Sequence, residues 1–209
     1  MPNPQSKMKL LIATLILLAI TAVACSSDSG PKPAIEPSSA VGNYETCTGF
    51  ISFDSIADLT GVEGLFERVS VTDVAGVPEL AESGATDSCL VEIFQSVDES
   101  DNPVSGESLT LFLVRFENSE LAQEQYNSTL ASALIGTEQL GELALLQQDV
   151  VGTNSYLMDV SASGIGALVV FAFDSTFVSI SSTADDESNA LFDGHSLVNA
   201  AQSVQSRLP

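Results

Sequence analysis

The most constraining feature of this chain is a series of short apolar segments joined by very short turns. Three or four segments in the second half have strand character: Ala144–Val151, Ser155–Ala162, Ala167–Phe173 and Phe177–Ser182. The turns between them contain only two to four residues. Parallel neighbours need a crossover of a dozen or more residues, so these connections demand antiparallel pairing. The second half of the chain therefore predicts an antiparallel sheet.

The first half adds two or three strands, predicted at Phe66–Val71, Ser88–Ser96 and Ser108–Phe116. Ser108–Phe116 is apolar on both faces, which is typical of a central strand. The acidic segment Asp98–Glu107 joins the last two as a long hairpin loop. The stretch Val74–Asp87 is rich in Gly and Pro and is expected to be mostly loop.

Three segments have helical character. The first is Phe53–Leu59, capped by Ser52 or Asp54 and stopped by Gly61. The second and clearest is Ser119–Ile135, which is expected to end at Gly136. Its predicted core-facing stripe is Ala122, Tyr126, Leu130, Ala133 and Leu134. The third is about Asn189–Leu208, although Gly194 weakens its start and leaves Asp193 as an alternative cap.

This order of elements predicts an α+β fold. We expect an antiparallel sheet of about five to seven strands with two or three helices packed on one face. The sheet face without helices is the expected contact surface.

The N-terminus has the layout of a secretory signal peptide. Lys7 and Lys9 precede an uncharged apolar stretch of about 14 or 15 residues, which is short for a membrane-spanning helix of roughly 20. Small residues follow and end in Ala22-Val23-Ala24-Cys25. The alternatives are an ordinary cleaved signal peptide with a coincidental Cys, and a retained membrane helix.

The Ala-Val-Ala-Cys sequence resembles the lipobox of bacterial lipoproteins, although Ala22 stands where Leu is commoner. The resemblance implies that residues 1–24 are a signal peptide cut before Cys25, and that Cys25 carries two or three acyl chains. Two or three chains suffice for stable membrane attachment. Residues 25–43 are then the lipidated Cys and a Ser/Pro/Gly-rich flexible linker, and residues 44–209 a single domain. The expected location is a cell or outer membrane surface, outside the cytoplasm.

Two further cysteines remain after Cys25 is assigned to lipidation. In an exported protein an even remainder predicts one structural disulfide, Cys47–Cys89. Two free thiols or a metal-binding pair are the alternatives. The general layout also resembles small PsbP-like domains and actinobacterial lipoproteins of unknown function. Members of those groups often carry one Cys before the first helix and another on an early strand.

The charge balance excludes one class of partner. The chain has 28 Asp and Glu against six Lys and Arg, and loss of Lys7 and Lys9 would leave four bases. Nucleic-acid binding needs a basic footprint, so it is not expected.

The search for chemistry gives weak candidates only. His195 is the sole His, and the chain has no G-x-S-x-G motif. Gly164-Ile-Gly166 leads into a strand and lacks a neighbouring Lys, so it is a poor phosphate loop. The acidic turns Asp98–Glu107 and Asp185–Glu187 lack the spacing of a Ca²⁺ loop, and a weak Ca²⁺ site is the alternative to solvated turns. We therefore expect no catalytic residue, no metal and no cofactor.

Three functions follow in order of preference. The first is a membrane-anchored, non-catalytic binding or interaction domain with an unknown protein or small-molecule partner. The second is a small-ligand carrier or sensor with a cleft between helix and sheet. The third is an envelope hydrolase that uses His195.

Overall fold

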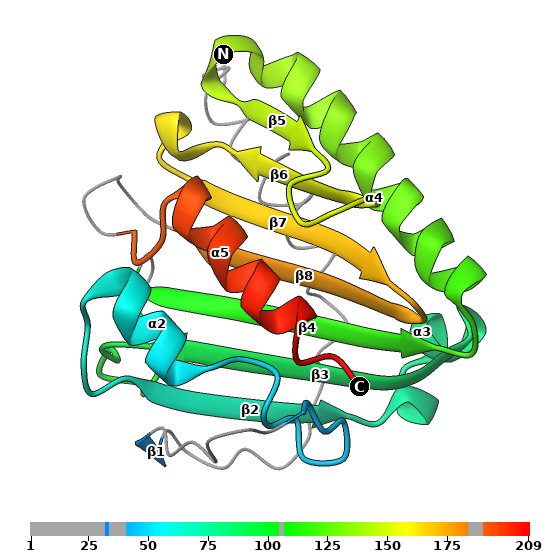
Figure 1. The fold of residues 1–209 in the computed structure, drawn as a ribbon, viewed down its shortest axis with the longest axis horizontal. Helices are drawn as coiled ribbons and strands as arrows, with labels where there is room; N and C mark the ends of the chain where they lie inside the picture. Colours follow the sequence, from blue (N-terminus) through cyan, green and yellow to red (C-terminus); the bar gives the residue numbers. More distant parts are fainter. Residues whose placement is uncertain (1–31, 34–40, 105–106, 184–189) are drawn as a thin grey trace.

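The computed structural model describes residues 32–33, 41–104, 107–183 and 190–209. They form an α+β fold around one antiparallel sheet, as the sequence predicted (Figure 1). The seven longer strands are β2 (Phe66–Thr72), β3 (Ala85–Phe94), β4 (Ser108–Phe116), β5 (Leu145–Gln148), β6 (Ser155–Asp159), β7 (Gly166–Phe173) and β8 (Thr176–Thr183). The two-residue strand β1 (Lys32–Pro33) adds to one edge. The helices are α2 (Phe53–Thr60), α3 (Pro78–Glu82), α4 (Ser119–Leu140) and α5 (Gly194–Gln205).

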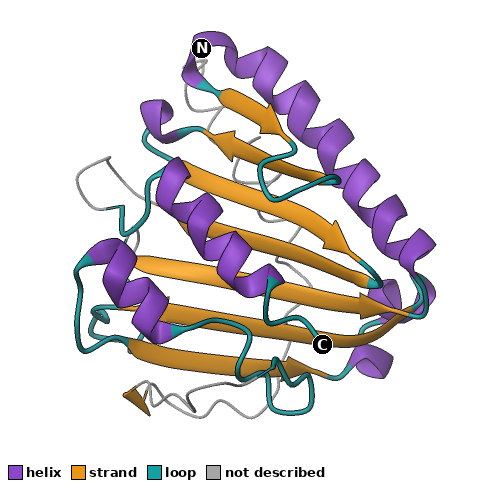
Figure 2. Cartoon of the chain, in the orientation of Figure 1, coloured by secondary structure: helices purple, strands orange, loops and turns teal. Residues whose placement is uncertain are grey.

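The sheet consists of two antiparallel blocks that meet in its middle. Its strand order is β1-β2-β3-β4-β8-β7-β6-β5. Helix α4 carries the chain from the central strand β4 to the far edge at β5, and the chain then returns through three short turns (Figure 2). The last strand of the return, β8, pairs with β4 and closes the sheet. The predicted hairpin of β3 and β4 and the central position of β4 are both confirmed.

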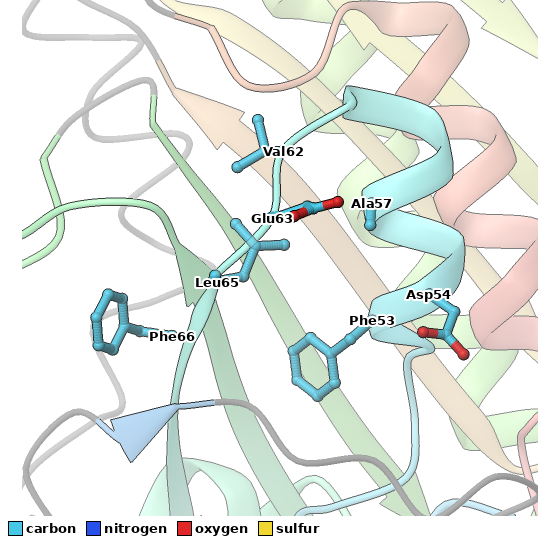
Figure 3. Close-up of a pocket in the computed structure, with 8 residues that line it drawn as sticks. Phe53, Asp54, Ala57, Val62, Glu63, Leu65 and Phe66 are labelled. Atoms are coloured by element: carbon cyan, nitrogen blue, oxygen red, sulfur yellow. The ribbon is translucent and has the colours of Figure 1, made fainter.

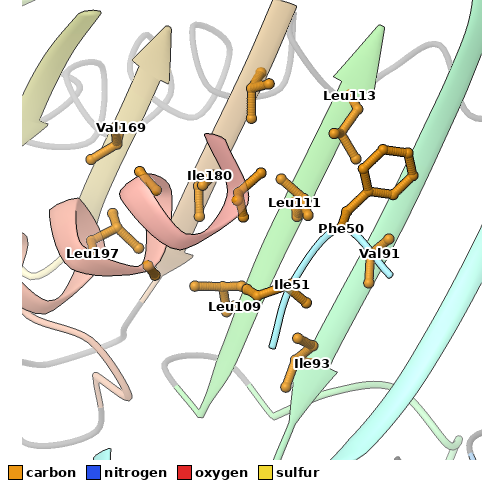
Figure 4. Close-up of a cluster of buried hydrophobic side chains, with 14 of the residues drawn as sticks. Phe50, Ile51, Val91, Ile93, Leu109, Leu111, Leu113, Val169, Ile180 and Leu197 are labelled. Atoms are coloured by element: carbon orange, nitrogen blue, oxygen red, sulfur yellow. The ribbon is translucent and has the colours of Figure 1, made fainter. Parts of the chain in front are cut away.

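One face of the sheet is covered by α2 and α5, and we call it the α5 face (Figure 1). Alternate residues of β4, Leu109, Leu111 and Leu113, are fully buried there and pack with Val169 and Ile180 of the second block (Figure 4). Leu197, Ala200, Ala201 and Val204 of α5 are also fully buried. The space between α5 and the sheet is therefore filled by side chains.

The opposite face, which we call the α4 face, is covered by α4. Phe112 and Val114 of β4 alternate with the leucines above, and they cluster with Tyr156 of β6 and with Ala122 and Tyr126 of α4. The sequence indicated helices on one face only. The expectation that one face of the sheet is free of helices is therefore wrong. The chain must cross that face to travel from β4 to β5, and α4 makes this crossing.

The helix ends follow from local capping. The Ser52 hydroxyl accepts a hydrogen bond from the Ser55 backbone N–H at 3.3 Å, and α2 ends at Gly61 in the left-handed region with φ 68°. Asp193 caps α5, and its Oδ1 accepts from the Ser196 N–H at 2.7 Å. Of the two starts considered for the last helix, the later one is correct.

Helix α4 is longer than expected because Gly136 does not stop it. The helix runs on to Leu140, and Gly141 (φ 56°) follows it. Gly136 is buried on the stripe that faces the sheet, where a small residue allows close packing. Leu134 was expected in that stripe, but it is 47% exposed because it lies one residue beyond the buried Ala133.

Other boundaries moved by a few residues. β3 begins at Ala85 rather than Ser88, and the stretch expected to be loop contains the short helix α3 with Pro78 at its first turn. β5 ends at Gln148 and β6 at Asp159, because irregular backbone follows each strand earlier than the apolar pattern suggested. Strand ends are the least reliable part of a pattern-based prediction.

The filled space under α5 predicts a large cost for truncation there. We expect Leu197→Ala to lower the free energy of unfolding by about 2–5 kcal/mol, because it removes a fully buried side chain and leaves a cavity. The matched control is Leu134→Ala on the exposed side of α4, for which we expect less than about 0.5 kcal/mol. Urea unfolding of both variants measures the difference, and equal costs would contradict the packing of α5.

Candidate functional site

The predicted disulfide Cys47–Cys89 is present in the structure. Its two Cα atoms are 5.4 Å apart, and both residues are fully buried on the α5 face. Cys89 lies in β3, whereas Cys47 lies in the irregular segment before α2 and has φ 53°. The bridge therefore fixes the segment that enters the domain onto the sheet.

A polar cluster centred on Tyr44 lies beside the disulfide. The Tyr44 hydroxyl shares a hydrogen bond with Thr176 Oγ1 at 3.1 Å, and its ring meets Phe50 edge-on at 4.8 Å. The Arg115 guanidinium lies 4.8 Å from the centre of the same ring and donates to Asp87 at 2.7 Å. Burial raises the pKa of Tyr44 to about 12. This cluster is structural, since each charged group already has a partner.

The proposed lipidation site, Cys25, lies outside the described residues, as does most of the linker 25–43. The acidic turn Asp185–Glu187 also lies outside them. Among the helices that the structure does describe, none is long and apolar enough to cross a bilayer.

The first part of the acidic turn, residues 98–102, is organised by its own backbone and by an arginine. Asp98 Oδ1 accepts hydrogen bonds from the Ser100 and Asn102 N–H groups at 2.8 and 3.0 Å, which lowers the pKa of that carboxyl. The Asp101 carbonyl accepts from Arg68 at 3.3 Å, and Arg68 also pairs with Glu92 at 2.7 Å. Across residues 41–104, 107–183 and 190–209, no three His, Cys, Asp or Glu side chains come together to hold a metal ion.

Gly164 and Gly166 form a turn that shapes the sheet. Gly164 (φ 72°) ends a 3₁₀ turn, and Gly166 (φ 121°) begins β7. A Cβ atom at Gly166 would collide with the backbone carbonyl oxygen of Ser182 in β8. The glycine is therefore required for strand pairing.

One pocket lies between α2 and the start of β2, close to the point where β1 joins the sheet (Figure 3). It has a volume of about 430 Å³ and is walled mainly by Phe53, Ala57, Val62 and Leu65. The carboxylates of Asp54 and Glu63 are exposed at its rim. Its lining suits a small apolar group.

A second pocket lies on the α5 face beside the edge strand β5. Its volume is about 390 Å³, and it is lined by Leu145, Gln147, Val150, Leu157, Asp159, Gly194, His195 and Val198. His195 is exposed in the first turn of α5, as expected for a surface helix residue. The lining side chains include one imidazole and one carboxylate but no hydroxyl or thiol. This set can bind a cation or a basic side chain, whereas it supplies no nucleophile for acyl transfer.

The carboxylate of this pocket is held in place by the turn that follows β6. Asp159 Oδ1 accepts hydrogen bonds from the Ser161 N–H at 3.0 Å and from its hydroxyl at 2.6 Å. A Cβ atom at Gly194 would lie 2.8 Å from Asp159 Oδ2, so the absence of a side chain at Gly194 lets α5 begin beside this carboxylate. The strand pairing places Asp159 opposite Leu145.

The turn that shapes β5 is fixed by Ser155. Its Oγ accepts from the Val151 N–H at 2.8 Å and donates to the Gly152 carbonyl at 2.7 Å. Asp149, Gly152 and Asn154 all have positive φ angles, which suits the Gly and Asn that marked this turn in the sequence. The β5–β6 edge is therefore an ordered element.

The β5 edge and its pocket were missed in the sequence. One signal was available, namely the four leucine and isoleucine residues between Leu134 and Leu145 that the structure leaves exposed. The helical pattern assigned Leu134 to the core, and only the order of the strands shows that β5 lies at an edge. Comparisons of the chain with protein-family models, curated proteins and solved structures found no match. The candidate site therefore rests on the geometry of this chain.

The disulfide should contribute strongly to stability. It closes a loop with a sequence separation of 42, which on the chain-entropy model corresponds to about 4 kcal/mol. We expect the double variant Cys47→Ala/Cys89→Ala to lose most of this free energy of unfolding. Urea unfolding measures it, and reduction of the wild-type protein should give a similar loss. An unchanged midpoint in both cases would contradict the prediction.

The buried tyrosines predict an alkaline limit to stability. Burial raises the pKa of Tyr44 and of Tyr156 from 10.0 to about 12, so the folded state holds these protons more tightly than the unfolded state. The contribution of these two tyrosines to stability should be constant below pH 10 and fall as the pH rises from 10 to about 12, by about 2–3 kcal/mol per tyrosine. Unfolding free energies across this range test it, and Tyr156→Phe should reduce the slope. In the folded protein, a tyrosinate absorbance near pH 10 that corresponds to more than one of the three tyrosines would contradict it.

Proposed function

We propose that this protein is a lipid-anchored, extracytoplasmic lipoprotein whose domain is a non-catalytic interaction module. Attachment through Cys25 follows from the lipobox-like sequence Ala22-Val23-Ala24-Cys25. The observation that carries the proposal is the buried Cys47–Cys89 disulfide, because stable disulfides belong to oxidising compartments outside the cytoplasm. The signal-like N-terminus and the disulfide are independent of each other, and both favour export.

Binding rather than catalysis is favoured by how the domain uses its residues. Ala200, Ala201 and Val204 fill the space between the second half of α5 and the sheet, which argues against a ligand cleft there. The pocket with His195 lies at the start of this helix. The polar groups around Tyr44 and Arg68 are engaged with partners within the fold. The β5 edge and its adjoining pocket present backbone, apolar and acidic groups together, which suits recognition of another chain.

A small-ligand carrier is the second candidate. It is favoured by the apolar lining of the pocket between α2 and β2, whose volume lies within the range of small-molecule sites. Native mass spectrometry of the mature protein, isolated from its own envelope, separates the two candidates. A bound small molecule favours the carrier, and a co-purifying protein favours the interaction module.

Lipidation at Cys25 can be tested directly. In a bacterial host that processes lipoproteins, we expect the full-length protein to fractionate with membranes and its mature mass to include acyl chains. Cys25→Ser should abolish both, because the thiol that is acylated is gone, while the neighbouring control Ser26→Ala should retain both. A mature wild-type protein with an unmodified Cys25 would overturn the anchor.

A further inference from the structure

The outer edge of β5 offers backbone groups for pairing. In the described part of the chain, β5 pairs with β6 on one side and with no strand on the other. The Asp149 N–H donates to the Ser155 carbonyl at 2.8 Å, which makes this a hydrogen-bonded pair of the ladder. Because such pairs alternate along an antiparallel ladder, Leu146 and Gln148 turn their N–H and C=O groups away from β6. These groups face the open edge.

The edge has little of the protection that natural sheets usually carry. Edge strands are commonly blunted by charged side chains or proline. The sequence of β5 is Leu-Leu-Gln-Gln, which contains neither a charged residue nor a proline. Its short length is the protection that this sequence provides. Of the eight large apolar side chains that are exposed in the described residues, Leu145 lies in β5 itself, and Leu134, Ile135 and Leu143 lie in the chain just before it. Their positions indicate a surface that becomes covered in a complex.

The pocket beside β5 indicates which side chain a partner would insert. Leu145, Leu157 and Val198 provide apolar walls, and Asp159 provides a fixed carboxylate. Lys and Arg side chains combine an apolar stem with a cationic head that binds carboxylates. A strand added next to β5 would place alternate side chains on the α5 face, beside Leu145 and Gln147 that line the pocket.

The negative charge of the second half of the chain also favours a partner with basic side chains. From residue 116 to residue 206 the sequence contains 12 Asp and Glu and no Lys or Arg. This stretch supplies α4, β5 to β8 and α5, so the elements around the β5 edge carry acidic side chains and one histidine. Such a surface attracts a cationic segment and repels a second copy of itself.

We propose that β5 is a docking edge for an extended, basic segment of a partner protein. The segment adds as a further strand through the backbone groups of Leu146 and Gln148, and a Lys or Arg side chain enters the pocket with Asp159. This mode of recognition takes affinity from main-chain hydrogen bonds and specificity from alternate side chains. The inference rests on the proposed interaction function and names the chemistry of the partner.

The test uses the mature domain and a synthetic peptide of alternating Lys and Val, with a Glu-Val peptide as the charge control. Gln148→Pro removes an N–H that faces the open edge and that β6 pairing does not use, so the fold should persist. Gln148→Ala is the matched control that keeps this N–H. We expect Gln148→Pro to weaken Lys-Val binding by about tenfold or more and Gln148→Ala by less than about twofold. Asp159→Asn should weaken binding by about tenfold, because charge-assisted bonds are roughly twice as strong as neutral ones.

Amide hydrogen exchange gives a readout that general charge attraction does not move. On binding of the Lys-Val peptide, the amides of Leu146 and Gln148 should become protected. Loss of binding in Gln148→Pro should occur with an unchanged thermal midpoint. Binding of the Lys-Val peptide that is equal in Gln148→Pro and Gln148→Ala would overturn the inference, because the peptide would then be held by surface charge alone. Concentration-dependent dimers that Gln148→Pro abolishes would also overturn it, since the occupant would be a second copy.

Failure of this inference can be told apart from failure of the proposed function. Wild-type and Gln148→Pro proteins, each with an intact Cys25, are cross-linked in their own membrane. If both capture the same partner, the interaction function stands and the β5 edge is the wrong surface. If the Lys-Val peptide fails to bind and neither protein captures a partner, the interaction function falls with it.

Discussion

The pairing of β4 with β8 is the interaction on which the rest of the fold depends. Without it the chain would consist of two separate antiparallel blocks, β1 to β4 and β5 to β8. Leu111 lies opposite Ile180 in this pairing, and Leu113 lies opposite Val178. All four side chains are fully buried, so the seam between the blocks is also the centre of the core on the α5 face. Helix α4 packs across this seam, since it contacts β4 as well as the strands of the second block. Helix α5 contacts β6, β7 and β8 of the second block and also α2.

The seam also dictates the path of α4. Because β8 occupies the position next to β4, the chain that leaves β4 must first travel to the far edge. A helix of 22 residues spans that distance and covers the α4 face on its way. The exposed positions Leu134 and Ile135 at its far end are therefore brought towards β5 by topology. The crossing of α4 from β4 to β5 thus explains both the buried cluster on the α4 face and the position of the candidate docking edge.

Local sequence signals predicted the elements well and their assembly only in part. The turn at Gly152–Asn154 and the two apolar faces of Ser108–Phe116 depend on nearby residues, and these predictions are confirmed. Asp193, the alternative cap considered for the last helix, is the one that the structure shows. The Cys47–Cys89 bridge was also predictable, because only two cysteines remain once Cys25 is set aside.

The pairing of β4 with β8 was not predictable, since residues 114 and 177 have no local signal that joins them. The continuation of α4 through Gly136 depends on packing against the sheet, which a helix-stop rule does not contain. The β5 edge was missed for the same reason: which strand lies at an edge is a property of the complete sheet.

The position of β1 has a mechanical consequence for a chain that is tethered through Cys25. A tether of this kind would meet the described part of the chain at β1, on one edge of the sheet, whereas β5 lies on the other edge. Seven strand spacings of about 4.8 Å separate the two edges by roughly 34 Å. A pull on the anchor would therefore load the β1 edge first and then the disulfide that joins Cys47 to β3. The covalent bridge would pass that force from the N-terminal segment directly into β3, so the segment before α2 would not be peeled from the sheet.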